Sequence, residues 1–123
     1  MIALLSPAKT LDFSPTYVSN TTQPRLLKRS ESLVKTLRNK SVAHIQELMG
    51  ISENLAKLNR DRYRTFHLPF TEENAKPAIL AFKGDVYVGL MAETFTEADL
   101  NFAQTHLRII SGLYGLLRPL DLM

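Results

Sequence analysis

The most regular hydrophobic pattern in the chain runs from Val42 to Arg64. Apolar residues recur at helical spacing on both sides of a break at Gly50–Ser52, which predicts two helices joined by a short hairpin. Ser41 and Ser52 precede the two runs, where serine commonly caps a helix N-terminus. The residues expected to be buried between the helices are Val42, Ile45, Leu48, Met49, Leu55, Ala56 and Leu58.

A helix-hairpin-helix of this kind suits the binding of a backbone phosphate. The first N–H groups of a helix have no partner within it, and together with the helix dipole they attract an anion. Lys57, Arg60 and Arg64 recur at helical spacing, so they project from one side of the second helix. The alternative is an ordinary pair of packed helices whose basic side chains serve only solubility.

The rest of the chain alternates between strand-like and helix-like patterns, which predicts a mixed α/β fold. This fold combines a small sheet with a basic helical lobe over Arg25–Arg64. The expected elements are strands at Ile2–Leu5, Ala78–Phe82 and Leu107–Ser111, a long loop over Ala8–Pro24, a helix over Arg25–Arg38, and a helix that starts with a capping box at Thr96–Asp99.

The last segment, Ser111–Met123, alternates glycine with large apolar residues and has no polar tail. An apolar end of this kind needs a cover, which we expect to be either a second subunit or further chain. Left uncovered, it is expected to drive self-association.

The charge is unevenly distributed. The chain has 123 residues and a net charge of +3, but Arg25–Arg64 alone holds ten basic and four acidic residues. Lysine and arginine that neutralise phosphates release counterions, so a basic surface of this kind is typical of a protein that binds nucleic acid. The segment therefore favours DNA as a partner.

Composition excludes several other classes of site. There is no cysteine, so disulfides, thiolate nucleophiles and cysteine-ligated metals are excluded from this chain. The apolar run Ile2–Leu5 is too short for a signal sequence or a membrane span, which favours a cytosolic protein that does not bind membranes. We expect no cofactor and no metal site, because His44, His67 and His106 lie on different predicted elements without nearby acidic partners.

Three segments carry a family resemblance: Ser6–Asp12 (SPAKTLD), Ala81–Tyr87 (AFKGDVY) and Ser111–Asp121 (SGLYGLLRPLD). In this order and at these separations they resemble the YaaA family of peroxide-stress proteins, also labelled a domain of unknown function. The resemblance spans essentially all of residues 1–123. Family members continue well past this point, so the chain resembles the N-terminal portion of a single YaaA-type domain, with the helix-hairpin-helix at residues 42–60.

The resemblance implies a cytosolic bacterial protein of mixed α+β fold that supports tolerance of hydrogen peroxide and limits intracellular free iron. It also implies nonspecific binding of duplex DNA, including distorted duplexes, through the helix-hairpin-helix. The chain departs from the common hairpin form at Met49, where proline is usual, and at Ser52, where a second glycine is usual. The DNA-binding candidates are Gly50, Ile51, Ser52, Lys57, Arg60 and Arg64.

A second candidate site collects polar residues that follow predicted strands, a position where open α/β sheets often place their ligands. The candidates for a phosphate or ligand pocket are Lys9, Thr10, Lys83, Tyr114 and Arg118, and the candidates for catalysis are Lys83, Asp85 and Asp121. Such a pocket favours an enzyme that acts on a nucleotide or a DNA base, with an aspartate as general acid or base. The alternative is an internal salt-bridge network with the tyrosine in the core.

Overall fold

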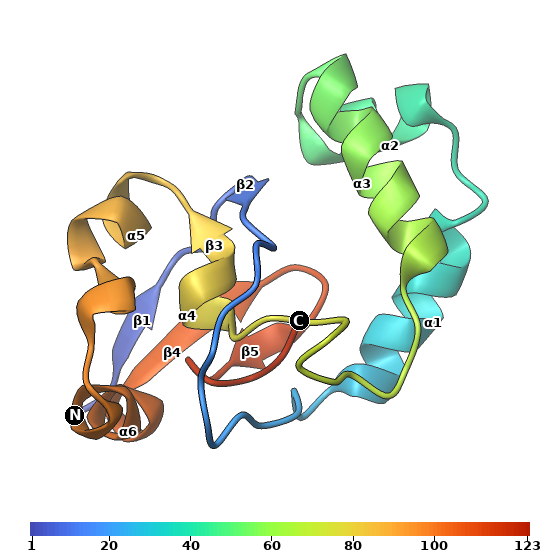
Figure 1. Ribbon diagram of the computed structural model, residues 1–123. Coiled ribbons are helices and arrows are strands. Elements are labelled where there is room, and N and C mark those ends of the chain that lie inside the picture. Colours follow the sequence, from blue (N-terminus) through green and yellow to red (C-terminus); the bar gives the residue numbers. More distant parts are fainter. The chain divides into compact units, whose positions relative to one another are not determined.

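The computed structural model describes residues 1–123, which form two units. One unit, the sheet unit, comprises Met1–Leu27 and Phe70–Met123, and the other, the helical unit, comprises Lys28–Pro69 (Figure 1). The elements are β1 (Ala3–Leu5), β2 (Thr10–Leu11), α1 (Leu27–Leu37), α2 (Val42–Met49), α3 (Glu53–Thr65), α4 (Ala78–Ala81), β3 (Phe82–Lys83), α5 (Asp85–Leu90), the 3-10 helix η1 (Ala92–Thr94), α6 (Glu97–His106), β4 (Leu107–Ser111) and β5 (Gly115–Leu117). The predicted mixed α/β class is confirmed.

The helical unit is held together by a small core and by one arginine. Val34, Ile45 and Ala56, one from each helix, are buried. Arg38 follows the end of α1, and its Nε donates a hydrogen bond of 2.7 Å to the carbonyl oxygen of Tyr63, while its Nη2 donates to that of Phe66. Arg38 thereby satisfies carbonyl groups at the C-terminal end of α3, which have no partner within the helix.

The larger sheet has the strand order β1-β4-β5. β1 pairs with β4 in parallel, with Leu5 opposite Ile109, and β4 pairs with β5 antiparallel, with Ile109 opposite Leu117. Ile109 and Leu117 are fully buried, so the central strand anchors the core. The predicted strands at the N-terminus and at Leu107–Ser111 are confirmed.

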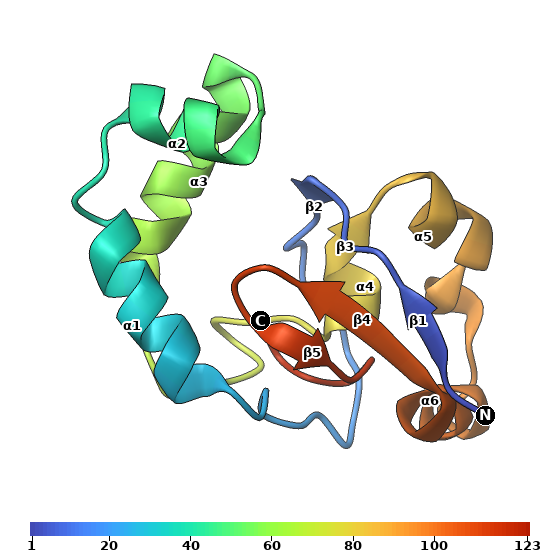
Figure 2. The ribbon, with the colours of Figure 1, turned by 180° about the vertical axis from the view of Figure 1, so that it is seen from behind.

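Within the sheet unit, only one face of this sheet is covered by a helix. Of the helices of the sheet unit, Figures 1 and 2 show α4 on one face and none on the other face, which is turned toward the viewer in Figure 2. Leu4, Ile110 and Leu116 project onto that open face and are 60%, 48% and 48% exposed. Alternation along the strands explains this arrangement, because neighbouring residues point to opposite faces.

A second, two-stranded sheet joins segments that lie far apart in the sequence. β2 pairs antiparallel with β3, with Thr10 opposite Lys83, and the N–H of Asp12 donates a hydrogen bond of 2.7 Å to the carbonyl of Ala81. A Cβ built on Gly84 would come within 3.1 Å of the Ala8 Cβ, so these two segments of the backbone approach each other closely. Ser6–Asp12 and Ala81–Tyr87, two of the three segments that carry the resemblance, therefore lie side by side.

The predicted strand over Ala78–Phe82 is wrong. Ala78–Ala81 forms one short helical turn, and only Phe82 and Lys83 are extended. All four residues of the turn are buried, which explains the uninterrupted apolar run. A short buried apolar run has no distinguishing period, and alanine and leucine favour helix over strand.

Three residues expected between the paired helices are exposed instead. Leu48 and Met49 of α2 are 71% and 37% exposed and Leu58 of α3 is 43% exposed, whereas Asn59 is buried. The Asn59 side chain is accommodated because its amide donates to the Leu55 carbonyl, at 2.8 Å. The interface between α2 and α3 is therefore narrower than the hydrophobic pattern predicts.

The apolar C-terminal residues are covered within the chain. Leu120, Leu122 and Met123 are all buried. The backbone of Met123 exchanges two hydrogen bonds with that of Lys76, at 3.1 and 3.0 Å. The expectation that a second subunit or further chain must cover these residues is therefore not met, and self-association through the C-terminal segment stays a prediction.

The capping box at the start of α6 is confirmed. The Thr96 hydroxyl accepts a hydrogen bond from the N–H of Asp99 at 3.1 Å, and the Asp99 carboxylate accepts one from the N–H of Thr96 at 2.9 Å. Hydrogen bonds that the Asp99 carboxylate accepts from Thr96, first of all from its N–H, hold the pKa of Asp99 below its ordinary value. No helix of the structure has both the length and the apolar composition needed to cross a membrane.

Candidate functional site

The connection between α2 and α3 is a tight turn capped on both sides. Gly50 adopts φ 60° and ψ 45°, a left-handed conformation that ends α2, and its N–H donates to the carbonyl of Gln46. Ser52 is extended and its hydroxyl accepts a hydrogen bond of 3.2 Å from the N–H of Leu55, so it caps α3. Ile51 between them is 9% exposed and anchors the turn in the core. Gly50 and Ser52 are thus exposed on a fixed backbone.

The start of α3 leaves donors available. The N–H of Ala56 donates to the Ser52 carbonyl, and the N–H of Leu55 donates to the Ser52 hydroxyl. Glu53 and Asn54 come before these two residues in the first turn of α3. The N–H groups of a first helical turn have no acceptor within the helix. They carry the positive end of the α3 dipole, which favours an anion at this position. The Glu53 carboxylate lies in the same turn and opposes that preference.

The three basic candidates on α3 differ in their surroundings. Lys57 forms an ion pair of 3.2 Å with Glu53, and both side chains are more than half exposed. Arg60 is half-buried, and its Nε is buried without a hydrogen-bond partner. Arg64 is exposed near the C-terminal end of α3. An exposed pair such as Lys57 with Glu53 is weak, so Lys57 is free to exchange its partner for a phosphate.

Arg62, a fourth basic residue of α3, has a guanidinium whose pKa is shifted by burial. Burial lowers the pKa of the Arg62 guanidinium from its ordinary value, although arginine stays charged at neutral pH. Arg60 and Arg62 are thus partly buried in the surface of the helical unit, which reduces the side-chain entropy that they lose on binding a phosphate, whereas Lys57 and Arg64 are exposed.

Asp121 lies at the centre of a buried hydrogen-bond network in the sheet unit. The carboxylate is 0% exposed. Its Oδ1 accepts from the Thr22 hydroxyl at 2.6 Å and from the Arg118 guanidinium at 2.8 Å, and its Oδ2 accepts from the Arg118 N–H at 2.8 Å. Gln104 extends the network by donating to the Thr22 hydroxyl at 3.1 Å and accepting from the N–H of Leu120 at 2.8 Å.

This network joins three distant parts of the sequence and leaves little capacity for chemistry. Arg118 also donates to the carbonyl of Gln23 at 2.9 Å, which ties the N-terminal segment to the C-terminal one. Both carboxylate oxygens of Asp121 are occupied by these donors, and the side chain is closed to solvent. Asp121 and Arg118 are therefore best explained as a structural clamp.

The polar residues near β2 and β3 form a separate cluster. Thr10 lies opposite Lys83 in the ladder, which brings the Lys9–Thr10 dipeptide next to Lys83. Asp85 is exposed at the first position of α5. Tyr114 is instead buried against Phe70, with ring centroids 6.1 Å apart. The structure thus pairs Thr10 with Lys83 and places Arg118 and Asp121 in the other network.

The most unusual residue of this cluster is one that sequence reasoning missed. Lys76 is 5% exposed, and its Nζ lies 3.8 Å from Oδ1 of Asp12. Burial lowers the pKa of the Lys76 ammonium, Asp12 opposes that shift and Lys83 reinforces it. Lys76 lies in a polar segment whose sequence carries no strand or helix signal, so only the fold reveals its burial.

Asp12 is held as a carboxylate. Its Oδ1 accepts a hydrogen bond of 2.8 Å from the N–H of Ser14. This bond is the main cause that lowers the pKa of Asp12, with smaller contributions from Lys76 and Lys83. Asp12 is 39% exposed, so the cluster opens to solvent at this residue.

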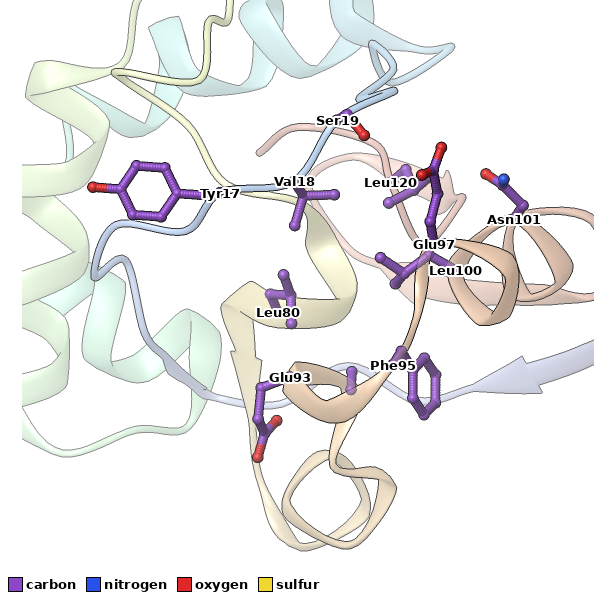
Figure 3. Close-up of a pocket in the computed structure, with 11 residues that line it drawn as sticks. Tyr17, Val18, Ser19, Leu80, Glu93, Phe95, Glu97, Leu100, Asn101 and Leu120 are labelled. Carbon is purple, nitrogen blue, oxygen red and sulfur yellow. The ribbon is translucent and has the colours of Figure 1, made fainter.

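A hollow of about 220 Å³ lies elsewhere in the sheet unit (Figure 3). Val18, Leu80 and Leu100 supply its apolar wall, and Glu93 and Glu97 supply carboxylates. None of the predicted site residues lines it. Two carboxylates disfavour a phosphate group there, so this hollow does not serve the predicted ligand chemistry.

No group of three or more histidine, aspartate or glutamate side chains is arranged to hold a metal ion. Comparison with known protein families gives one finding. The family model described as peroxide stress protein YaaA matches residues 1–123.

Proposed function

Because the chain belongs to the peroxide stress protein YaaA family, we propose that it acts in peroxide stress by binding DNA through the α2–α3 hairpin. The observation that carries this proposal is the exposed start of α3, where a capped helix N-terminus meets the Gly50–Ser52 turn. The proposal treats this pair as a helix-hairpin-helix motif. Its site of action is the cytoplasm, where bacterial DNA lies.

The N–H groups of Glu53 and Asn54 would hold one phosphate, since Ser52 already occupies that of Leu55. Lys57, Arg60 and Arg64 would contact neighbouring phosphates along the strand. Such contacts position the protein on the duplex without reading its sequence. The expected binding is therefore nonspecific and depends on salt. Exposed Leu48 and Met49, next to the turn, fit an unpaired or distorted base step better than a regular duplex.

Bound along DNA, the protein would limit oxidative damage at the place where free iron and peroxide react. An effect on iron then follows indirectly, without a metal site in this chain.

The proposal is tested by fluorescence anisotropy with a labelled duplex and the same duplex carrying a bulge. The variant Lys57→Ala/Arg60→Ala/Arg64→Ala is compared with Lys28→Ala/Arg29→Ala/Lys35→Ala, which removes the same charge from α1. The first variant should lose binding to both duplexes, and the second should bind within a fewfold of wild type. Equal losses of DNA affinity in the two variants would show that binding depends on net charge alone, and would contradict the proposal.

A second candidate function is an enzyme that acts on a nucleotide or a DNA base. The observation that favours it is the Thr10–Lys83 pairing beside a buried lysine and a carboxylate. Under this function Asp85→Asn should abolish turnover and leave DNA affinity unchanged. Loss of DNA affinity in that variant would contradict this division of roles.

A further inference from the structure

Lys76 is held on a rigid stretch of backbone. Its N–H donates to the Met123 carbonyl at 3.1 Å, and its own carbonyl accepts from the Met123 N–H at 3.0 Å. The next residue, Pro77, caps α4, and its carbonyl accepts hydrogen bonds from Leu80 and Ala81 at 2.9 Å. The base of the Lys76 side chain is therefore fixed, which reduces the number of positions that its amine can occupy.

The surroundings of the Lys76 amine are those of an activated nucleophile rather than of a stable ion pair. Its side chain is 6% exposed, and its one ion-pair contact, to Asp12, is long at 3.8 Å. A buried ammonium needs close partners to offset lost hydration, and a single carboxylate at this distance offsets little. Burial is the main cause that lowers the pKa of the Lys76 ammonium; Asp12 raises it and Lys83 lowers it further. Desolvation and a neighbouring cation are the two means by which proteins make a lysine amine nucleophilic.

The cluster also indicates what would accompany the reacting group. Lys83 and Thr10 face each other across the β2–β3 ladder, and a lysine beside a hydroxyl is a common arrangement for holding a phosphate. Asp12 is partly exposed, so a ligand would enter from that side. The site thus offers one amine, one carboxylate and one cation within a single cluster.

We propose that Lys76 is a nucleophilic amine that forms an imine with an aldehyde carried next to a phosphate group. The nitrogen lone pair attacks the carbonyl carbon, and a proton moves to the oxygen to give a carbinolamine. Water then leaves with that oxygen and two hydrogens, and a C=N bond remains. The step needs no oxidant or reductant. The ammonium first loses its proton to water, and the Asp12 carboxylate stays ionised and neutralises the protonated imine, while Lys83 holds the phosphate.

An aldehyde next to a phosphate has two sources that this chemistry does not distinguish. One is an abasic deoxyribose in DNA, and the other is a free sugar phosphate. The inference stands without the proposed DNA binding, because the Lys76 cluster lies in the sheet unit and the hairpin lies in the helical unit. An arm with a free aldehyde therefore tests Lys76 even if the protein binds no DNA.

The test is trapping with borohydride, which adds hydride to an imine and makes the bond permanent. The protein is incubated at neutral pH with glyceraldehyde 3-phosphate in one arm and with a duplex containing an abasic site in the other. The reduced adduct is the label, and mass spectrometry of the digested protein identifies the lysines that carry it. We expect label on Lys76 at least tenfold above that on the exposed Lys35 in one or both arms, and the productive arm identifies the source.

Variants complete the design. Lys76→Ala should lose this label, whereas Lys35→Ala, whose lysine is 70% exposed and lies in the helical unit, should retain it. The map of the wild-type protein is decisive even if Lys76→Ala fails to fold, because it locates the adduct without any substitution. Label distributed over exposed lysines, with Lys76 unmodified in both arms, would overturn the proposal. Normal binding of an intact duplex in the same sample would show that the hairpin proposal survives that failure.

Discussion

Replacing Asp121 by alanine should destabilise the sheet unit far more than replacing any other of the catalytic candidates. The substitution removes the acceptor of the Thr22 hydroxyl, the Arg118 N–H and the Arg118 guanidinium, all at 2.6 to 2.8 Å. The carboxylate is fully buried, and Arg118 is 19% exposed, so water replaces these bonds only in part. A charge-assisted hydrogen bond contributes about 1.5–3 kcal/mol, and removing one member of a buried pair costs about 3–5 kcal/mol.

We therefore expect Asp121→Ala to lower the free energy of unfolding by about 3–5 kcal/mol, a large share of the stability of a domain of this size. The assay is urea denaturation followed by far-ultraviolet circular dichroism and by tyrosine fluorescence. Asp85→Ala is the matched control, because that exposed carboxylate only begins a short helix and should contribute less than about 1 kcal/mol. Similar small losses in the two variants would refute the assignment of Asp121 as a structural clamp.

Three further predictions concern the helix ends. Gly50→Ala should destabilise the helical unit by about 1–2 kcal/mol because Gly50 has a left-handed backbone conformation; the added Cβ itself would meet no atom within 4 Å. Gly50→Asn should destabilise the unit less, because asparagine tolerates this conformation better, and urea denaturation measures both variants. The bonds within the capping box lower the pKa of Asp99 in the folded state from 3.8, so its contribution is present above that pH and lost as pH falls further. Asp99→Asn should therefore flatten the acid side of the stability profile, and an unchanged profile would contradict this. Glu53→Gln removes a negative charge from the start of α3 and should tighten DNA binding, whereas Glu93→Gln should not; anisotropy compares them.

The elements that could be predicted from the sequence are those with a local signal. Thr96 and Asp99 have the spacing of a capping box, and Gly50 and Ser52 have the residue types that end and begin helices. The structure shows all four in these roles. Such signals work because the hydrogen bonds involved connect residues only a few positions apart.

The errors arose where tertiary contacts decide the outcome. Ala78–Ala81 is apolar throughout because it is buried on every side, so the run carried no period to separate helix from strand. Lys76 was missed because its burial depends on Asp12 and Met123, which lie 64 and 47 residues away along the chain. The Asp121 network was likewise hidden, since Thr22 is 99 residues distant.

The central claim, that the α2–α3 hairpin holds DNA phosphates, is tested most directly by the salt dependence of binding. Anisotropy titrations across a range of salt concentrations give the slope of log K against log salt, which changes by about 0.9 for each phosphate that the protein no longer neutralises. We predict a shallower slope for Lys57→Ala/Arg60→Ala/Arg64→Ala and an unchanged slope for Lys28→Ala/Arg29→Ala/Lys35→Ala. A wild-type slope in the hairpin variant would contradict the account.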